Sequence, residues 1–141
     1  TFISSTFWGE RVGYTAALSS IKEFKRLKIF KKIESNGKLI KSIWLDLSKK
    51  YNVPIKVTGR NSILSFEFCK NHTQRKTYFT QEMLKNKILA TNLIYITIFH
   101  NKKNIKKYIK ILEKVFSDIS KKNIKSILKS KLCFKPINRI N

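Results

Sequence analysis

Two hydroxyl side chains near the start of the sequence have the type and position to bind a phosphate. Ser5 and Thr6 end a strand-like run at 2–6 and precede a helical pattern that begins at about residue 11. The backbone N–H groups of a strand-to-helix turn, together with flanking hydroxyls, hold anions such as phosphate. The same hydroxyls also serve as ordinary helix caps, and spacing alone favours the cap. The residues by themselves therefore leave both interpretations of Thr6 open.

No other set of residues has the spacing of a reaction centre. His100 stands alone after a predicted strand, so we expect a structural histidine, and His72 lies in a polar stretch where we expect it to be solvated. Cys69 has the position of a small buried residue, and Glu67 suits a buried or an outward place equally well. Gly-rich phosphate loops, HExxH and GxSxG are missing from the sequence. We therefore expect no catalytic residue and no metal site in this chain.

Length and composition predict one domain-sized, cytoplasmic unit. The chain has 141 residues, of which 42% are hydrophobic, and this is enough to build a core. No apolar run approaches the roughly 20 residues that a membrane helix needs, so we expect no membrane partner. Cys69 and Cys133 lack CxxC spacing, which indicates reduced thiols rather than a disulfide framework.

The net charge of +23 is the strongest compositional signal, and it has two interpretations. The chain has 31 Lys and Arg against 8 Asp and Glu, and residues 101–141 alone carry a net charge of +11. Nearly all of these cations are lysine, and the abundance of Asn, Ile and Lys is typical of an AT-rich coding sequence. We therefore favour surface lysines without a nucleic-acid partner. The alternative is a lysine-rich domain that binds a polyanion.

The hydrophobic period changes along the chain, which predicts an α+β fold with helices covering one face of a small, mostly antiparallel sheet. Gly37 is expected to loosen the second helix, and Asn101 is expected to cap the last long one. Helical periods occur at 11–27, 29–51, 78–85 and 101–119. Alternating periods occur at 55–59, 63–68, 88–90 and 94–99.

The opening segment also carries a family resemblance. STFWGERVGYTAAL at 5–18 resembles the part of class-III aminotransferases, which depend on pyridoxal 5'-phosphate (PLP), that follows the catalytic lysine. Its Thr-Phe-Trp-Gly-Glu-Arg-x-Gly form is similar to a branch close to glutamate-1-semialdehyde 2,1-aminomutase. Further stretches resemble this family in the same order: WLDL and the residues up to Gly59 at 44–59, YFTQEMLKNKILA at 78–90, TIFHN and the following helix at 97–116, and INRIN at 137–141.

The resemblance implies a place within a larger enzyme. It implies the small C-terminal domain of a fold-type-I PLP enzyme that works as a homodimer on a small amino-acid or amino-sugar-like substrate. Thr6, with Ser5 beside it, is then expected to bind the cofactor phosphate of the partner subunit, while the Schiff-base lysine lies upstream of this chain. The implied division is 1–28 for the end of the large domain and its linking helix, 29–119 for the small domain, and 120–141 for a basic tail.

Two departures from the family pattern affect the expected activity. The stretch at 94–98 has no Arg, which argues against ornithine- or GABA-type enzymes because these clamp a substrate carboxylate with it. The stretch at 91–94 is short and has no acid, whereas the aminomutases usually carry Glu-Ala-Gly-Phe there. We therefore expect a transaminase, with the aminomutase as the alternative.

Overall fold

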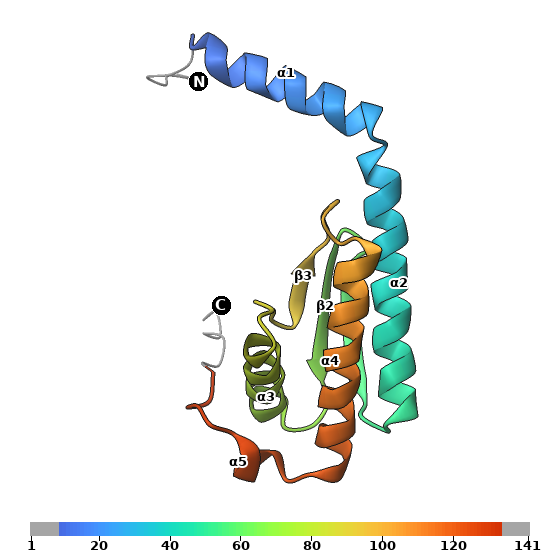
Figure 1. The fold of residues 1–141 in the computed structure, drawn as a ribbon, viewed down its shortest axis with the longest axis vertical. Helices are drawn as coiled ribbons and strands as arrows, with labels where there is room; N and C mark the ends of the chain where they lie inside the picture. The colour runs from blue at the N-terminus through green and yellow to red at the C-terminus, as the bar shows by residue number, and fades with distance from the viewer. Residues whose placement is uncertain (1–8, 134–141) are drawn as a thin grey trace, which may run out of the picture. The chain divides into compact units, whose positions relative to one another are not determined.

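The computed structural model describes residues 9–133, and residues 1–8 and 134–141 lie outside this part. Contacts divide the chain into two units, Thr1–Lys32 and Ile33–Asn141, and each is described by itself. The division predicted from the family resemblance stays a prediction. The elements, labelled in Figure 1, are α1 (Arg11–Arg26), α2 (Ile29–Lys50), β1 (Ile55–Arg60), β2 (Ile63–Phe68), α3 (His72–Lys85), β3 (Leu93–Tyr95), α4 (Lys102–Lys121) and α5 (Ile124–Ile127).

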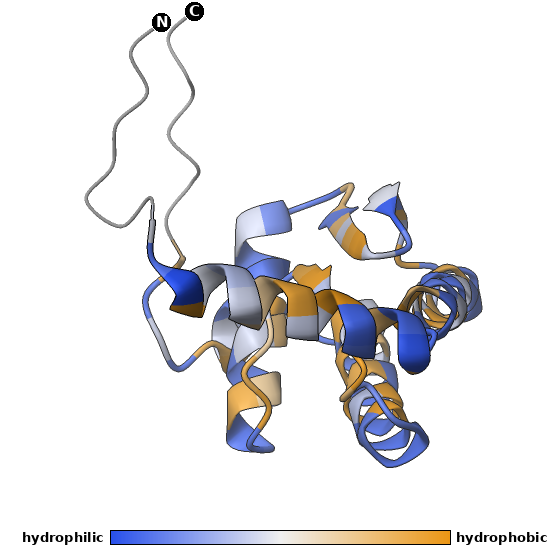
Figure 2. Ribbon diagram, turned by 90° about the horizontal axis from the view of Figure 1, so that it is seen from above, coloured by the Kyte–Doolittle hydropathy of each residue, from blue (hydrophilic) through white to orange (hydrophobic). Residues whose placement is uncertain are grey.

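The first unit contains α1, which has an apolar stripe but buries none of its residues. The stripe consists of Tyr14, Leu18, Ile21 and Phe24, which follow one another at three- and four-residue steps and are all exposed. The hydropathy colouring of Figure 2 shows hydrophobic and hydrophilic residues together in this helix. An isolated helix of this length is marginal in water, so the stripe is the part of α1 that packing would stabilise.

The second unit is built on a three-stranded antiparallel sheet in the order β1-β2-β3. Alternation along β2 buries Leu64, Phe66 and Phe68 and leaves Glu67 on the opposite, exposed face. The helices pack on the buried face, and α4 lies between α2 and α3 in Figure 1. The predicted α+β class, with helices on one face of a small antiparallel sheet, is therefore confirmed.

The core is centred on Phe66. Its ring lies 4.7 Å from that of Trp44 on α2 and 5.5 Å from that of Phe79 on α3, both in edge-to-face geometry. Trp44 also donates its indole N–H to the Tyr108 hydroxyl on α4 at 2.9 Å, which satisfies the one polar atom of this buried side chain. These contacts fix the helices against the inner face of the sheet.

Gly37 does not loosen α2, contrary to our expectation. The helix runs without interruption, and Gly37 is buried against the turn between β1 and β2. A Cβ atom at this position would lie 1.9 Å from the backbone oxygen of Asn61. The missing side chain therefore lets the turn approach the helix, and Asn61 secures it by donating to the Glu34 carboxylate at 2.6 Å.

Two predicted strands and one helix start are corrected. Residues 88–90 are not a strand, because Ile88 N–H donates to Met83 C=O and Lys87 N–H to Leu84 C=O, which ends α3 in a Schellman motif. The predicted strand at 94–99 shortens to β3, because Ile96 N–H already reaches the hairpin turn at Ser62 and, in the described part of the chain, no partner strand continues beyond it. The third helix starts at His72 rather than at 78.

The early start of α3 has a tertiary cause. Its first turns are polar and carry no apolar period, but Thr77 is buried beneath the C-terminal segment. There Cys133 N–H donates to the Thr77 hydroxyl at 3.0 Å. The hydrophobic periodicity of residues 72–77 cannot predict a contact with a segment 56 residues away in the chain. Asn101, by contrast, caps α4 as predicted, since its side chain accepts from the Asn104 N–H at 3.0 Å.

Candidate functional site

The predicted phosphate ligands, Ser5 and Thr6, lie outside the described residues. The described chain supplies the helix that follows them. The N-cap of α1 is Glu10, whose side chain makes no capping hydrogen bond, and the first turn holds no acidic residue. Among the described residues, its backbone N–H groups therefore have no side-chain cap, and uncapped N–H groups at a helix N-terminus are suitable donors to a phosphate.

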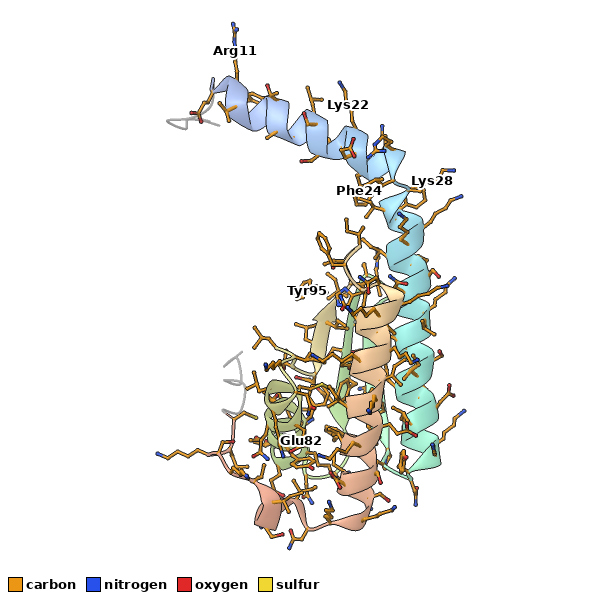
Figure 3. All side chains as sticks on the ribbon, viewed as in Figure 1. Arg11, Lys22, Phe24, Lys28, Glu82 and Tyr95 are labelled. Atoms are coloured by element: carbon orange, nitrogen blue, oxygen red, sulfur yellow. The ribbon has the colours of Figure 1, made fainter. Side chains whose placement is uncertain are left out.

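The described residues of the second unit form an open groove of about 690 Å³ beside β3. Apolar side chains from α2, the segment after α3, β3 and α4 form its buried and half-buried part: Ile40, Ile88, Ile94, Ile105 and Tyr108. Exposed side chains along it include Lys87, Leu89, Tyr95, Phe99 and Lys107. Tyr95, labelled in Figure 3, is the last residue of β3.

Hydrogen bonds hold the turn that carries Phe99 at this groove. His100 accepts the Thr97 N–H on Nδ1 at 3.0 Å, and the Asn104 amide donates to Phe99 C=O at 2.9 Å. The Asn36 amide on α2 donates to His100 C=O at 2.8 Å. His100 is therefore a structural residue, as predicted, and its role is to order the turn between β3 and α4.

The other predicted polar residues do not join a common site. His72 begins α3, and its Nδ1 accepts the Phe68 N–H at 3.2 Å, so it is held by the backbone rather than solvated in a loop. Cys69 is exposed, which corrects the buried position that we expected. Glu67 is also exposed, opposite Lys56 in the sheet register. Within residues 9–133, no group of three or more His, Cys, Asp or Glu side chains could hold a metal ion.

A buried polar cluster links α3 to α4. The Tyr78 hydroxyl donates to Asp118 at 2.6 Å, and Lys122 pairs with the other carboxylate oxygen at 2.5 Å. On the next turn of each helix, Lys114 pairs with the buried Glu82, which Figure 3 shows on α3. Each acid has a cation and the cluster lies within packed helices, so its role is to join them.

The pKa directions in this cluster follow from burial and pairing. Burial alone raises the pKa of Asp118, but hydrogen bonds from Lys122 and Tyr78 and the nearby charges outweigh it, so its pKa is below the usual value. Burial, followed by the Asp118 carboxylate, raises the pKa of Tyr78 far above its usual value. The hydroxyl therefore stays protonated and Asp118 stays charged at neutral pH.

Replacing Asp118 with Asn is expected to destabilise the protein by about 1–2 kcal/mol at neutral pH, because a buried charged hydrogen-bond acceptor is lost. The pKa of Asp118 is lower in the folded protein than in the unfolded chain, where it is about 3.9. The charged carboxylate therefore stabilises the fold above this unfolded pKa, and the stabilisation is lost as the pH falls through the folded pKa. The difference from the unmodified protein should therefore shrink below about pH 4. Urea unfolding at several pH values measures it.

The matched control for this prediction is Asp46→Asn, because Asp46 is exposed. We expect its unfolding free energy to follow that of the unmodified protein across the same pH range. An Asp118→Asn variant with the same stability as the Asp46→Asn variant at neutral pH would show that the cluster does not stabilise the fold.

Sequence reasoning missed the groove because its parts are far apart in the chain. Ile40, Ile88 and Ile105 meet there only in the folded unit. A usable signal was present at Phe99, a large apolar residue directly before the polar His100 and the helix cap Asn101. The alternating residues at 94–99 favour a strand, whereas a strand that ends at Tyr95 leaves Phe99 on a turn.

Comparison with known proteins gives a match of fold. No family model and no curated protein matches the chain. Among solved structures, the PLP internal aldimine form of the Sphingopyxis sp. MTA144 FumI protein superposes with a TM-score of 0.73 at 16% identity. The match covers 91% of this chain and 33% of the FumI chain. The chain thus has the fold of about one third of a PLP-containing protein.

The same comparison bears on the other expectations drawn from the sequence. It supports the PLP-enzyme fold that the resemblance implied. The PLP itself was found in FumI and not in this chain. None of the helices in the described part of the chain combines the length and the apolar character needed to cross a bilayer.

Proposed function

We propose that this chain is the C-terminal part of a cytoplasmic, PLP-dependent class-III aminotransferase. The observation that carries the proposal is the superposition of 91% of the chain on one third of a PLP-containing protein. The ordered motifs from 5–18 to 137–141 support the class, and glutamate-1-semialdehyde 2,1-aminomutase is the alternative activity within it. In this proposal the chain works in a homodimer on a small amino-acid or amino-sugar-like substrate.

The cofactor and this chain have separate tasks in the proposed enzyme. When bound, PLP supplies the electron sink for chemistry at an amino-bearing carbon. The hydroxyls of Ser5 and Thr6 and the N–H groups at the start of α1 would hold its phosphate across the dimer. The helices and sheet of the second unit would form the small domain. The 141 residues alone are then expected to be inactive, because the Schiff-base lysine lies upstream.

The Thr6→Val variant of the protein carrying its upstream sequence is expected to bind PLP about tenfold more weakly, because a hydrogen bond to a charged group is lost. Valine keeps the shape of the side chain and removes the hydroxyl, so the fold should be preserved. PLP dissociation, followed by cofactor absorbance during dialysis, measures the effect.

Thr15→Val is the matched control for Thr6→Val. The Thr15 hydroxyl lies on the exposed surface of α1 and donates to Arg11 C=O at 2.8 Å, so its loss should leave PLP affinity unchanged. Equal PLP affinity in the Thr6→Val variant and the unmodified protein would refute the phosphate-binding role of Thr6.

A further inference from the structure

One histidine joins the end of β2 to the start of α3. Phe68, the last residue of β2, donates its backbone N–H to the Nδ1 atom of His72, the first residue of α3, at 3.2 Å. A ring nitrogen that accepts an N–H carries no proton, so His72 is neutral when this bond is made. Among the described residues, the N-cap Asn71 makes no side-chain capping bond and has a left-handed φ of 51°. The first turn of α3 therefore depends strongly on the contact of His72.

The chain around His72 is positively charged. Arg75 and Lys76 follow it by three and four residues on the same side of α3, Lys70 precedes it, and the first turn of the helix holds no acidic residue. Within residues 9–133, the Arg75 Nη1 atom is buried without a hydrogen-bond partner. Glu67 lies on the opposite, exposed face of the sheet. The helix macrodipole adds a further partial positive charge at this end of α3.

The neighbouring elements add cations rather than an unpaired acid. Tyr78 on α3 donates to Asp118 on α4, and because the two helices run antiparallel, the first turn of α3 lies level with Lys121 and Lys122. Asp118 already pairs with Lys122. The C-terminal segment that packs on α3 contributes Lys131. A proton on His72 would therefore add a positive charge to a region that is already positive.

The same turn of α3 holds the last described residues of the chain. The C=O group of Thr73, which follows His72 directly, accepts the Thr77 hydroxyl at 2.7 Å. The Thr77 oxygen in turn accepts the Cys133 N–H at 3.0 Å, and the Cys133 thiol donates to Thr73 C=O at 3.6 Å. Two hydrogen bonds to Cys133 thus require the first turn of α3 to be helical.

We propose that the start of α3 is a pH-sensitive switch, which holds residues 130–133 when His72 is neutral and releases them when His72 is protonated. An imidazolium has two donors and no acceptor, so the Phe68 N–H would lose its partner. The added charge also disfavours the helix at its N-terminus. Opening of this turn would move the Thr73 C=O away from Thr77, whose hydroxyl then no longer holds the C-terminal segment.

The direction of the pH effect follows from these contacts. Histidine side chains change charge between about pH 5 and about pH 8. The contacts are made by the neutral ring, so the switch is closed at about pH 8 and opens as the pH falls. The release should stop at Lys129, because its N–H donates at 2.7 Å to Gln81, which lies two turns further along α3.

The test is amide hydrogen exchange of the chain, followed by NMR at about pH 8 and about pH 5.5, with each rate divided into the intrinsic rate at that pH. We expect the protection of the Phe68 and Cys133 amides to fall about tenfold at the lower pH, the effect of losing about one hydrogen bond and adding charge at a helix N-terminus. The protection of the Lys129 amide should not change.

Three variants isolate His72. His72→Asn keeps an acceptor at about the position of Nδ1 and takes up no proton, so protection should be the same at both pH values. His72→Lys is positive and has no acceptor, so protection should be low at both. His100→Asn is the matched control, because His100 also accepts a backbone N–H on Nδ1, and this variant should respond to pH like the unmodified protein.

Several results would overturn the proposal. Constant protection of Cys133 in the unmodified protein would show that there is no switch. An equal fall in the His72→Asn variant would assign the pH effect to another group. Loss of the effect in His100→Asn would assign it to the other histidine. Full protection in His72→Lys would show that charge at this position does not open the helix. Circular dichroism checks that each variant is folded.

Discussion

Phe66→Ala is expected to destabilise the second unit by about 3–5 kcal/mol, the usual loss for a buried phenylalanine. The Phe66 ring is fully buried and contacts the rings of Trp44, Phe68 and Phe79, so truncation removes contacts to α2, β2 and α3 together. The remaining side chains lie in several elements and cannot all move into the cavity. Chemical unfolding followed by tryptophan fluorescence and circular dichroism measures the loss.

Two variants define what the Phe66 result means. Phe66→Leu keeps most of the apolar volume, so its loss should be clearly smaller than that of Phe66→Ala. Phe99→Ala removes a ring that is exposed, so its unfolding free energy should change by less than about 0.5 kcal/mol. If Phe66→Ala were no more destabilising than Phe99→Ala, the core would not be centred where the structure places it.

Gly37→Ala is expected to destabilise the protein by about 3 kcal/mol although alanine is the better helix former. The added Cβ would meet the Asn61 backbone oxygen at 1.9 Å, and a backbone atom cannot move aside as a flexible side chain can. The β1–β2 turn must then separate from α2, which also breaks the hydrogen bond between Asn61 and Glu34. Thermal and urea unfolding both report this loss.

The matched control is Gly13→Ala in α1. Among residues 9–133, nothing lies within 4 Å of a Cβ atom at Gly13, so we expect helix propensity to dominate and the helix to gain up to about 1 kcal/mol. Opposite signs for the two glycines would establish that Gly37 is required for close approach. A gain in stability from Gly37→Ala would contradict the packing of this turn on α2.

The long elements follow from the sequence because their patterns repeat. The helices α2 and α4 bury Ile40, Trp44, Leu112 and Val115 at the spacing that the periodicity predicted. The hairpin of β1 and β2 follows from two alternating runs around a short turn. In each case the local pattern and the tertiary contacts favour the same structure, so the pattern is sufficient.

The errors fall where a short run depends on distant partners. Ile88 and Ala90 pack beside the core as a strand would, but the end of α3 uses the Ile88 N–H. The residues after Ile96 have strand-like composition, but none of the strands described between residues 9 and 133 lies beside them. The composition of such a short run favours a strand. Whether a strand forms depends on where the neighbouring helix or strand ends.

The two candidate sites also differ in how far the local sequence predicts them. Ser5 and Thr6 come from a motif that is continuous in sequence, and their role stays a prediction because they lie outside the described residues. The groove beside β3 needs the folded unit before its parts meet, so neither Tyr95 nor Lys107 stood out from its local pattern.

We propose that this chain is part of a PLP-dependent enzyme whose Schiff-base lysine lies upstream of Thr6. The most direct measurement is the PLP content of the protein produced with its upstream coding sequence, combined with identification of the residue that carries the cofactor. We expect one PLP per chain, bound to a lysine that precedes Thr6. A protein that retains no PLP and has no such lysine would contradict it.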